Sequence, residues 1–237
     1  MSKRQILLLS SSRLAGFDYL EHAKEQIEGV LKPKQVKTVL FVPYALKNYD
    51  SYTKTVSDAL SKWGYKVEGI HEHSDPVKAV KSSEAVFIGG GNTFVLIKTL
   101  YEKNLIETIR ERVLEDHIPY IGSSAGTNVA TISIHTTNDM PVTYPPSFDA
   151  LKLVPFNINP HYLETDPNTK HRGETRDERI GEFVDYHKIS VLGLREGTAV
   201  FVDGDKTSLV GPFPAKLFKG TGETEELPPG SDLTFLC

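Results

Sequence analysis

The residues with the clearest chemical potential form the pentapeptide Gly122-Ser123-Ser124-Ala125-Gly126, a G-x-S-x-G motif. An apolar run at 119–121 predicts a buried strand before it, and a helix is expected after it. In a nucleophile elbow of this kind, flanking glycines let the backbone turn sharply and lift the central hydroxyl out of the sheet. The motif predicts Ser124 as a nucleophile and Ser123 as structural. A plain Ser/Gly turn that packs a helix on a strand is the alternative.

A serine nucleophile needs a base that removes its proton and a third group that orients the base. Among the eight histidines, His161 is the best placed, because it lies in the rigid turn Asn159-Pro160-His161-Tyr162 after a predicted apolar strand at 153–156. A hydrogen-bonded surface histidine is the plain alternative. Position alone leaves three other bases open, namely His117, His135 and His171.

The orienting carboxylate is expected at the end of a strand. Glu196 meets this requirement, because it follows directly after a predicted strand at 191–194. A solvated glutamate in a strand-end turn is the alternative. The neighbouring Arg195 is interpreted as a surface charge.

A second glycine-rich turn, Gly89-Gly90-Gly91-Asn92-Thr93, also follows a predicted strand and begins a helix. Consecutive glycines allow backbone N–H groups to converge on an anion, either a phosphate or the oxyanion of acyl transfer. The turn lacks the spacing of a dinucleotide fingerprint and the lysine of a P-loop. It therefore predicts an oxyanion hole formed by the N–H of Gly90 or Gly91 together with that of Ala125.

His71, His73 and Asp75 alternate at a predicted strand end, where two imidazoles on one face can hold a metal ion. No further cluster of ligands in the sequence supports such a site. The pattern favours a solvated strand end that leads into a helix, with Asp75 as its N-cap and Pro76 at its first position. Neither a metal nor another cofactor is expected.

The elements that must position these residues alternate between strands and amphipathic helices, which is typical of βαβ units around a parallel sheet. Strands are predicted at 6–9, 38–43, 67–70, 85–88 and 119–121, and helices at 17–31, at 50–63, from 76 and, as a pair, at 92–115. Residues 137–175 are rich in proline and polar residues and predict a long loop with substrate contacts. A helix at 173–186 and antiparallel strands at 191–194, 199–202 and 208–210 complete the chain.

Composition and charge restrict the class of protein. The 237 residues are 39% hydrophobic and 24% charged, as in soluble globular proteins, and are expected to form a single domain over 1–237. The net charge of −4, without long runs of one sign, indicates no nucleic-acid partner. The lone Cys237 allows no intramolecular disulfide, and the apolar run at 6–9 is too short to span a membrane. A cytoplasmic protein with no membrane partner is expected.

Taken together, these strings resemble the peptidase E family of α-aspartyl dipeptidases. The matching strings keep the family's order and are Gly89–Thr93, 122–126 with Asn128, Thr136–Pro141, Asn159–His161, Gly173–Arg176 and Leu194 with Glu196-Gly197. The resemblance implies a class I glutamine-amidotransferase-like fold. This is an α/β, three-layer α/β/α sandwich with a mostly parallel sheet, here with extra antiparallel β structure toward the C-terminus.

The resemblance also implies a serine dipeptidase that releases N-terminal aspartate from Asp-X dipeptides without a metal. By matching positions it makes Ser124 the nucleophile, His161 the base and Glu196 the orienting acid. A substrate carboxylate needs a cationic partner, and a guanidinium can hold it with two parallel hydrogen bonds. Arg176 is the first candidate, unless it forms an ordinary surface ion pair with Glu174. Arg172 and His171 are the alternatives to Arg176 for this carboxylate. Further candidate substrate contacts are Asn92 and, for the α-amino group, Asp139.

Two alternative functions remain open on the same scaffold. One is a related serine peptidase for β-aspartyl or cyanophycin-like branched substrates, and the other is a catalytically silent binding module. A glutamine amidotransferase is disfavoured because serine occupies the centre of the elbow. The expected partner is a small peptide, over which the polar loop at 162–172 is predicted to order, and the chain is expected to be a monomer or homodimer.

Overall fold

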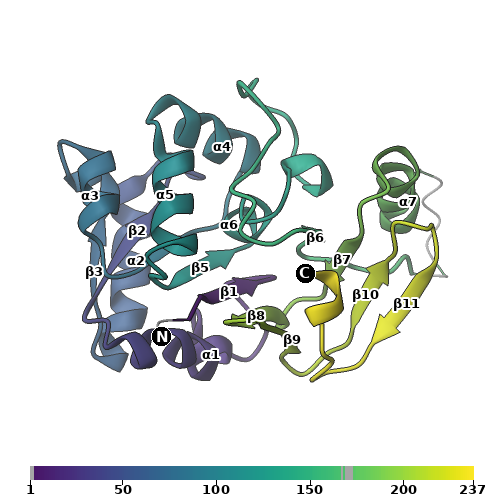
Figure 1. The fold of residues 1–237 in the computed structure, drawn as a ribbon, viewed down its shortest axis with the longest axis horizontal. Coiled ribbons are helices and arrows are strands. Elements are labelled where there is room, and N and C mark those ends of the chain that lie inside the picture. Colours follow the sequence, from purple (N-terminus) through teal and green to yellow (C-terminus); the bar gives the residue numbers. More distant parts are fainter. Residues whose placement is uncertain (1–2, 167, 169–172) are drawn as a thin grey trace.

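The computed structural model describes residues 3–166, 168 and 173–237 and contains a large and a small sheet (Figure 1). The strands of the large sheet are β1 (Gln5–Leu9), β2 (Thr38–Val42), β3 (Lys66–Gly69), β4 (Val86–Ile88), β5 (Tyr120–Ser123), β8 (Ala199–Asp203) and β9 (Lys206–Val210). Their order is β3-β2-β4-β5-β1-β8-β9. The first five run parallel, and β8 and β9 add antiparallel strands at one edge.

Helices cover both faces of the large sheet. They are α1 (Lys24–Leu31) and α2 (Tyr49–Leu60) on one face, and α3 (Pro76–Ser82), α4 (Thr93–Glu102), α5 (Leu105–Leu114) and α6 (Ala125–Asn128) on the other. The alternation of side chains along a strand separates two cores. Leu7 packs with Ile27 and Val56 of α1 and α2, whereas Leu8 packs with the helices of the opposite face. The predicted α/β sandwich with a mostly parallel sheet is confirmed.

The small sheet is built from strands of the second half of the chain and lies beside the large one (Figure 1). Its strands are β6 (Asn157–Asn159), β7 (Val191–Leu194), β10 (Ala215–Phe218) and β11 (Thr224–Leu227), in the order β11-β10-β7-β6. β6 and β7 are parallel because α7 (Arg176–His187) connects them, and the other pairs are antiparallel. The carboxyl ends of β6 and β7 therefore lie next to each other.

Two sequence predictions of elements were wrong. The helix expected at 17–31 begins only at Lys24, after a short 3-10 turn, because Leu20 has a positive φ of 63° and Phe17 is exposed. The described residues form no strand at 153–156. The strand in this region is β6, which begins directly afterwards at Asn157. The apolar side chains of 153–156 are largely buried, but Leu153 N–H donates to Ala130, so the segment packs on the end of α6.

The glycines of the elbow are required by close packing. A Cβ at Gly126 would overlap the carbonyl oxygen of Ile88 on β4, and one at Gly122 would overlap the carbonyl oxygen of Gly126. The turn between β5 and α6 therefore fits against the neighbouring strand only without these side chains. This contact holds the start of α6 at the carboxyl edge of the sheet.

We expect Gly126→Ala to lower the free energy of unfolding by at least about 2 kcal/mol, because the added methyl group must displace backbone atoms. Gly181→Ala in α7 is the matched control, since a Cβ there meets nothing within 4 Å and alanine favours a helix by about 0.5–1 kcal/mol. Urea unfolding measures both variants. A wild-type midpoint for Gly126→Ala would contradict the packing argument.

Candidate active site

Ser124 occupies the turn between β5 and α6 with φ of 53° and ψ of −108°. This backbone conformation is strained for a residue with a side chain and is typical of functional turns. The Ser124 N–H donates to the carbonyl of Leu9 on β1 at 3.1 Å, and the Thr127 hydroxyl donates to the same carbonyl at 2.6 Å. The elbow predicted from the G-x-S-x-G motif is therefore formed and is anchored to β1, the strand next to β5.

His161 follows β6 and lies between Ser124 and Glu196. Its Nε2 is 2.9 Å from Ser124 Oγ, and its Nδ1 is 2.7 Å from Glu196 Oε1. Because an ionised carboxylate can only accept, Nδ1 carries the proton and Nε2 accepts from the serine hydroxyl. His161 also has a positive φ of 52°, so two of the three residues have unusual backbone conformations. The structure brings together all three residues singled out from the sequence.

Glu196 follows β7, which is the parallel neighbour of β6. This pairing places the orienting carboxylate beside His161, as the carboxyl ends of parallel strands meet at one edge. The Glu196 side chain is 56% exposed. The carboxylate therefore keeps contact with solvent while it hydrogen-bonds the imidazole.

Ser10 ties these elements together and was missed by the sequence analysis. Its buried hydroxyl accepts from the His161 N–H at 2.9 Å and donates to the Leu194 carbonyl at 2.8 Å. One side chain at the end of β1 thus holds both the base and the strand that precedes Glu196. A polar residue directly after a buried apolar strand was the available signal.

The segment around Asn138 supports the turn that carries His161. The Asn138 side chain donates to the Pro160 carbonyl at 2.7 Å, and Asn159 donates to Asn138 Oδ1 at 2.6 Å and to the Thr136 carbonyl at 2.8 Å. The Thr136 hydroxyl donates to Ile158 on β6 at 2.9 Å. The long predicted loop therefore contributes structure to the site.

Asn92 and Asp139 make contacts that hold this segment to α4. Asn92 is the N-cap of α4, and its amide donates to the Met140 carbonyl at 2.9 Å. Asp139 Oδ2 accepts from the Thr93 N–H at 2.7 Å. Neither side chain is among the residues that line the pocket at Ser124. These contacts give both residues a role in shaping the glycine turn rather than in lining the pocket.

The glycine turn lies against the nucleophile. A Cβ at Gly90 would be 3.0 Å from Ser124 Cβ, and the Gly90 N–H donates to the Tyr52 hydroxyl at 2.8 Å. Burial raises the pKa of Tyr52, which keeps this phenol neutral. Gly91 has a φ of 135°, and Ala125 begins α6, where the first N–H groups have no intrahelical acceptor. With Gly90 engaged, Gly91 and Ala125 are the better placed oxyanion donors.

Arg176 begins α7, after the Thr175 cap, and reaches the turn at His161. Its Nη1 is 3.3 Å from the His161 carbonyl and 3.4 Å from Asn159 Oδ1. Glu174 pairs with Arg179 instead, and no carboxylate pairs with Arg176 among the described residues. Burial, and then the charge of Arg179, lower the pKa of Arg176 from its ordinary value. The half-buried guanidinium remains available for a ligand anion.

Arg195 is not the surface charge that the sequence suggested. Its side chain is 17% exposed, donates to the Pro214 carbonyl at 2.7 Å and pairs with Glu164 and Glu226. The guanidinium also lies over the Tyr162 ring, 5.5 Å from its centre. Tertiary contacts thus use Arg195 to hold the chain that follows His161.

The remaining histidine predictions have different outcomes. His135 packs among the rings of Phe148, Phe183 and His187, and burial lowers its pKa. His117 does not line the pocket at Ser124. His171 and Arg172 lie outside the described residues, as does part of the loop predicted to order over substrate.

The histidines of the weighed metal site pair with separate carboxylates. His71 lies in a 3-10 turn rather than on a strand, 2.8 Å from Asp50, and His73 is 3.7 Å from Glu68. In the described part of the chain, no three His, Cys, Asp or Glu side chains converge as metal ligands. The strand geometry on which that interpretation rested is not formed.

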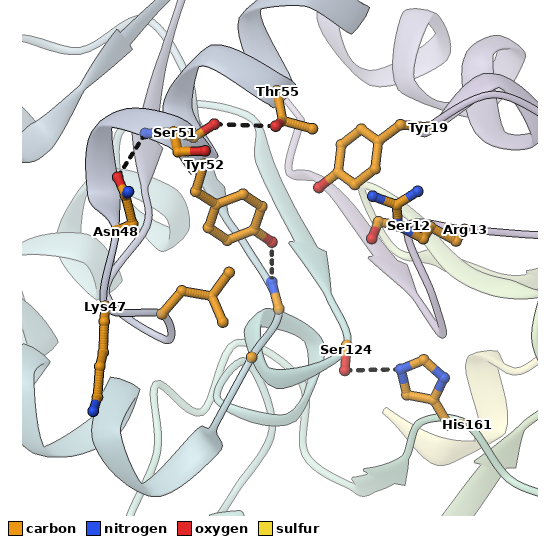
Figure 2. Close-up of a pocket in the computed structure, with 13 residues that line it drawn as sticks. Ser12, Arg13, Tyr19, Lys47, Asn48, Ser51, Tyr52, Thr55, Ser124 and His161 are labelled. Carbon is orange, nitrogen blue, oxygen red and sulfur yellow. Dashed lines mark hydrogen bonds between the residues drawn. The ribbon is translucent and has the colours of Figure 1, made fainter.

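A pocket of about 560 Å³ opens beside Ser124 and His161 (Figure 2). Its other lining residues are Ser12, Arg13, Tyr19, Leu46, Lys47, Asn48, Ser51, Tyr52, Thr55, Gly90 and Gly91. All of these except Gly90 and Gly91 come from α2, from the segment before it or from the segment after β1. The sequence analysis did not single out any residue of those three segments. The pocket is large enough for a small peptide.

An α/β sandwich with a serine, histidine and glutamate joined by hydrogen bonds at a nucleophile elbow defines a serine hydrolase. The sequence model of peptidase family S51 matches residues 6–210, and the chain belongs to this family of serine peptidases.

Two relatives span nearly the whole chain. "Probable alpha-aspartyl dipeptidase" of Drosophila melanogaster is 63% identical and covers 99% of this chain and 98% of its own. "Peptidase E" of Streptomyces coelicolor is 48% identical, with 98% and 94% covered. A solved peptidase from an acI-B1 actinobacterium has the same fold, with a TM-score of 0.73, 17% identity and coverage of 98% and 96%. Among the described residues, no helix is long and apolar enough to cross a membrane.

We expect Ser10→Ala to lower kcat by about 10-fold or more with little change in KM, because His161 loses the contact that holds it at Ser124. Ser83→Ala is the control, since it removes another serine hydroxyl, one that bonds to the Val80 carbonyl away from the site. Steady-state kinetics measures the effect on catalysis, and urea unfolding shows whether the variant has also lost stability. Equal kcat values for both variants would contradict a positioning role for Ser10.

Proposed function

We propose that the chain hydrolyses dipeptides with an N-terminal aspartate through a catalytic triad of Ser124, His161 and Glu196. One observation supports this assignment above all, namely the continuous hydrogen-bonded chain from Ser124 Oγ through His161 to Glu196, with distances of 2.9 and 2.7 Å. The names of full-length relatives, an α-aspartyl dipeptidase and a peptidase E, support the substrate class.

In the proposed reaction, Ser124 Oγ attacks the main-chain carbonyl carbon of the aspartyl residue while His161 Nε2 takes the serine proton. The N–H groups of Gly91 and Ala125 stabilise the oxyanion of the tetrahedral intermediate. His161 then gives its proton to the leaving amine, and an acyl-enzyme remains. Water, activated by His161, attacks this ester and releases aspartate. Glu196 holds the imidazole and stabilises its charged form.

The aspartyl side chain is assigned to Arg176. Its guanidinium lies at the His161 turn, is half-buried and has no carboxylate partner among the described residues. A guanidinium in this state gains from binding a carboxylate, because a charge-assisted pair replaces weaker contacts of 3.3 and 3.4 Å with carbonyl oxygens. The same side chain offers little to a neutral first residue.

The complete triad argues against a silent binding module, and α-linked substrates are preferred over β-aspartyl ones on the names of the relatives. The proposed partner is a small peptide, not nucleic acid or a membrane. A cytoplasmic location and a monomer or homodimer complete the proposal. The dipeptide pool of a reducing compartment suits an enzyme whose one cysteine is not part of the site.

We expect Ser124→Ala and His161→Ala each to reduce kcat on Asp-Leu by about 10⁴-fold, since the nucleophile and its base act as a unit. The double variant is expected to lose little more than either single one. Initial rates at saturating Asp-Leu measure the effect, and circular dichroism checks folding. Substantial turnover by a folded Ser124→Ala variant would refute the serine mechanism.

We expect Arg176→Ala to reduce kcat/KM for Asp-Leu by about 10- to 100-fold, because a charge-assisted contact of a half-buried guanidinium is lost. The value for Ala-Leu is expected to change little. Arg179→Ala is the matched control, as it removes an exposed arginine of the same helix that pairs with Glu174. Equal losses on both dipeptides would remove Arg176 from the pocket for the aspartyl side chain.

A further inference from the structure

The pocket beside Ser124 carries an arginine that the proposed function leaves unassigned. Arg13 follows β1 and lines the same pocket as Ser124 and His161, whereas Arg176 lines a different cavity. Arg13 and Lys47 are the charged residues of this lining, which contains no carboxylate. The described walls of the pocket therefore present positive charge next to the nucleophile.

The Arg13 guanidinium is free to bind an anion. It lies over the Tyr19 ring, 5.4 Å from the ring centre, and no carboxylate is present among the described residues that line this pocket. A guanidinium stacked on a ring is pre-oriented, and its edge keeps N–H groups that match the two oxygens of a carboxylate. Figure 2 shows Arg13 and Tyr19 on the same side of the view as His161.

The segment that carries Arg13 is tied to the catalytic base. The Ser11 hydroxyl donates to the Arg13 carbonyl at 2.8 Å, and the Leu20 N–H donates to the Ser12 carbonyl at 2.9 Å, which closes the turn. Ser10, three residues before Arg13, accepts from the His161 N–H. The segment that carries Arg13 is therefore fixed relative to His161, which protonates the leaving amine.

The chemistry of a dipeptide places a carboxylate close to that amine. In Asp-X, the leaving nitrogen belongs to residue X, and one Cα atom separates it from the C-terminal carboxylate. In a longer peptide, a neutral amide occupies that position. A cation placed at that position therefore meets a terminal carboxylate only when the substrate is a dipeptide.

We propose that Arg13 binds the C-terminal carboxylate of the dipeptide and restricts the enzyme to dipeptides. This assignment rests on the proposed function. It gives each carboxylate of Asp-X its own arginine, Arg176 for the aspartyl side chain and Arg13 for the leaving residue. Lys47 is the weaker choice, because Figure 2 shows its amine directed away from Ser124 and His161.

The test compares Asp-Leu with Asp-Leu-amide, which differ in the charge of the C-terminal group alone. We expect the wild-type chain to prefer Asp-Leu. Arg13→Ala is expected to lower kcat/KM for Asp-Leu by about 10- to 100-fold, mainly through KM, and to leave the amide nearly unchanged. Arg13→Lys is expected to recover part of the loss, since it restores charge without the bidentate geometry.

Three outcomes overturn the proposal. Equal losses on both substrates would place Arg13 at another part of the peptide, and unchanged kinetics would remove it from substrate binding. A selective loss in Lys47→Ala in place of Arg13→Ala would assign the carboxylate to the lysine. Asp-Leu-amide keeps the aspartyl residue with its side-chain carboxylate but lacks the C-terminal carboxylate, so its hydrolysis tests the proposed function separately. A wild-type chain that cleaves neither substrate would overturn both conclusions.

Discussion

The site depends on one junction, the contact between the carboxyl ends of β1, β6 and β7. Ser124 comes from the large sheet, whereas His161 and Glu196 come from the small one. The hydrogen bond between Ser124 and His161 therefore exists only while the two sheets keep their relative position. Ser10 provides that coupling with two hydrogen bonds, one to the His161 N–H and one to the Leu194 carbonyl.

Packing on both sides of the junction compensates for strain within it. Ser124 and His161 both have a positive φ, and each such residue costs about 1–3 kcal/mol. The larger hydrophobic core contains buried residues of both sheets, such as Leu8 on β1 and Leu192 on β7. Because this core is continuous, relaxation of either strained turn would disturb packing over a wide area. The strain is thus retained where the hydroxyl and the imidazole must meet.

Much of the fold and the triad followed from local patterns. The alternation of apolar strands and amphipathic helices predicted the parallel sheet, and the G-x-S-x-G motif at the end of β5 predicted the elbow at Ser124. Local patterns failed where burial did not require regular pairing, as at 153–156, whose apolar residues pack on α6 without forming a strand. They also misplaced Arg195, because its partners Glu164 and Glu226 are 31 residues away on either side.

The sequence by itself determined which residue types follow which strands, because the period of burial and the steric needs of glycine are local properties. Only the tertiary structure decided that Ser10 holds His161, that Asp139 accepts from the Thr93 N–H at the start of α4 and that Arg13 faces the pocket. Each of those roles depends on a partner in another element, from 46 to 151 residues away for the first two. Such contacts are set by how the sheets and helices pack, which no local pattern specifies.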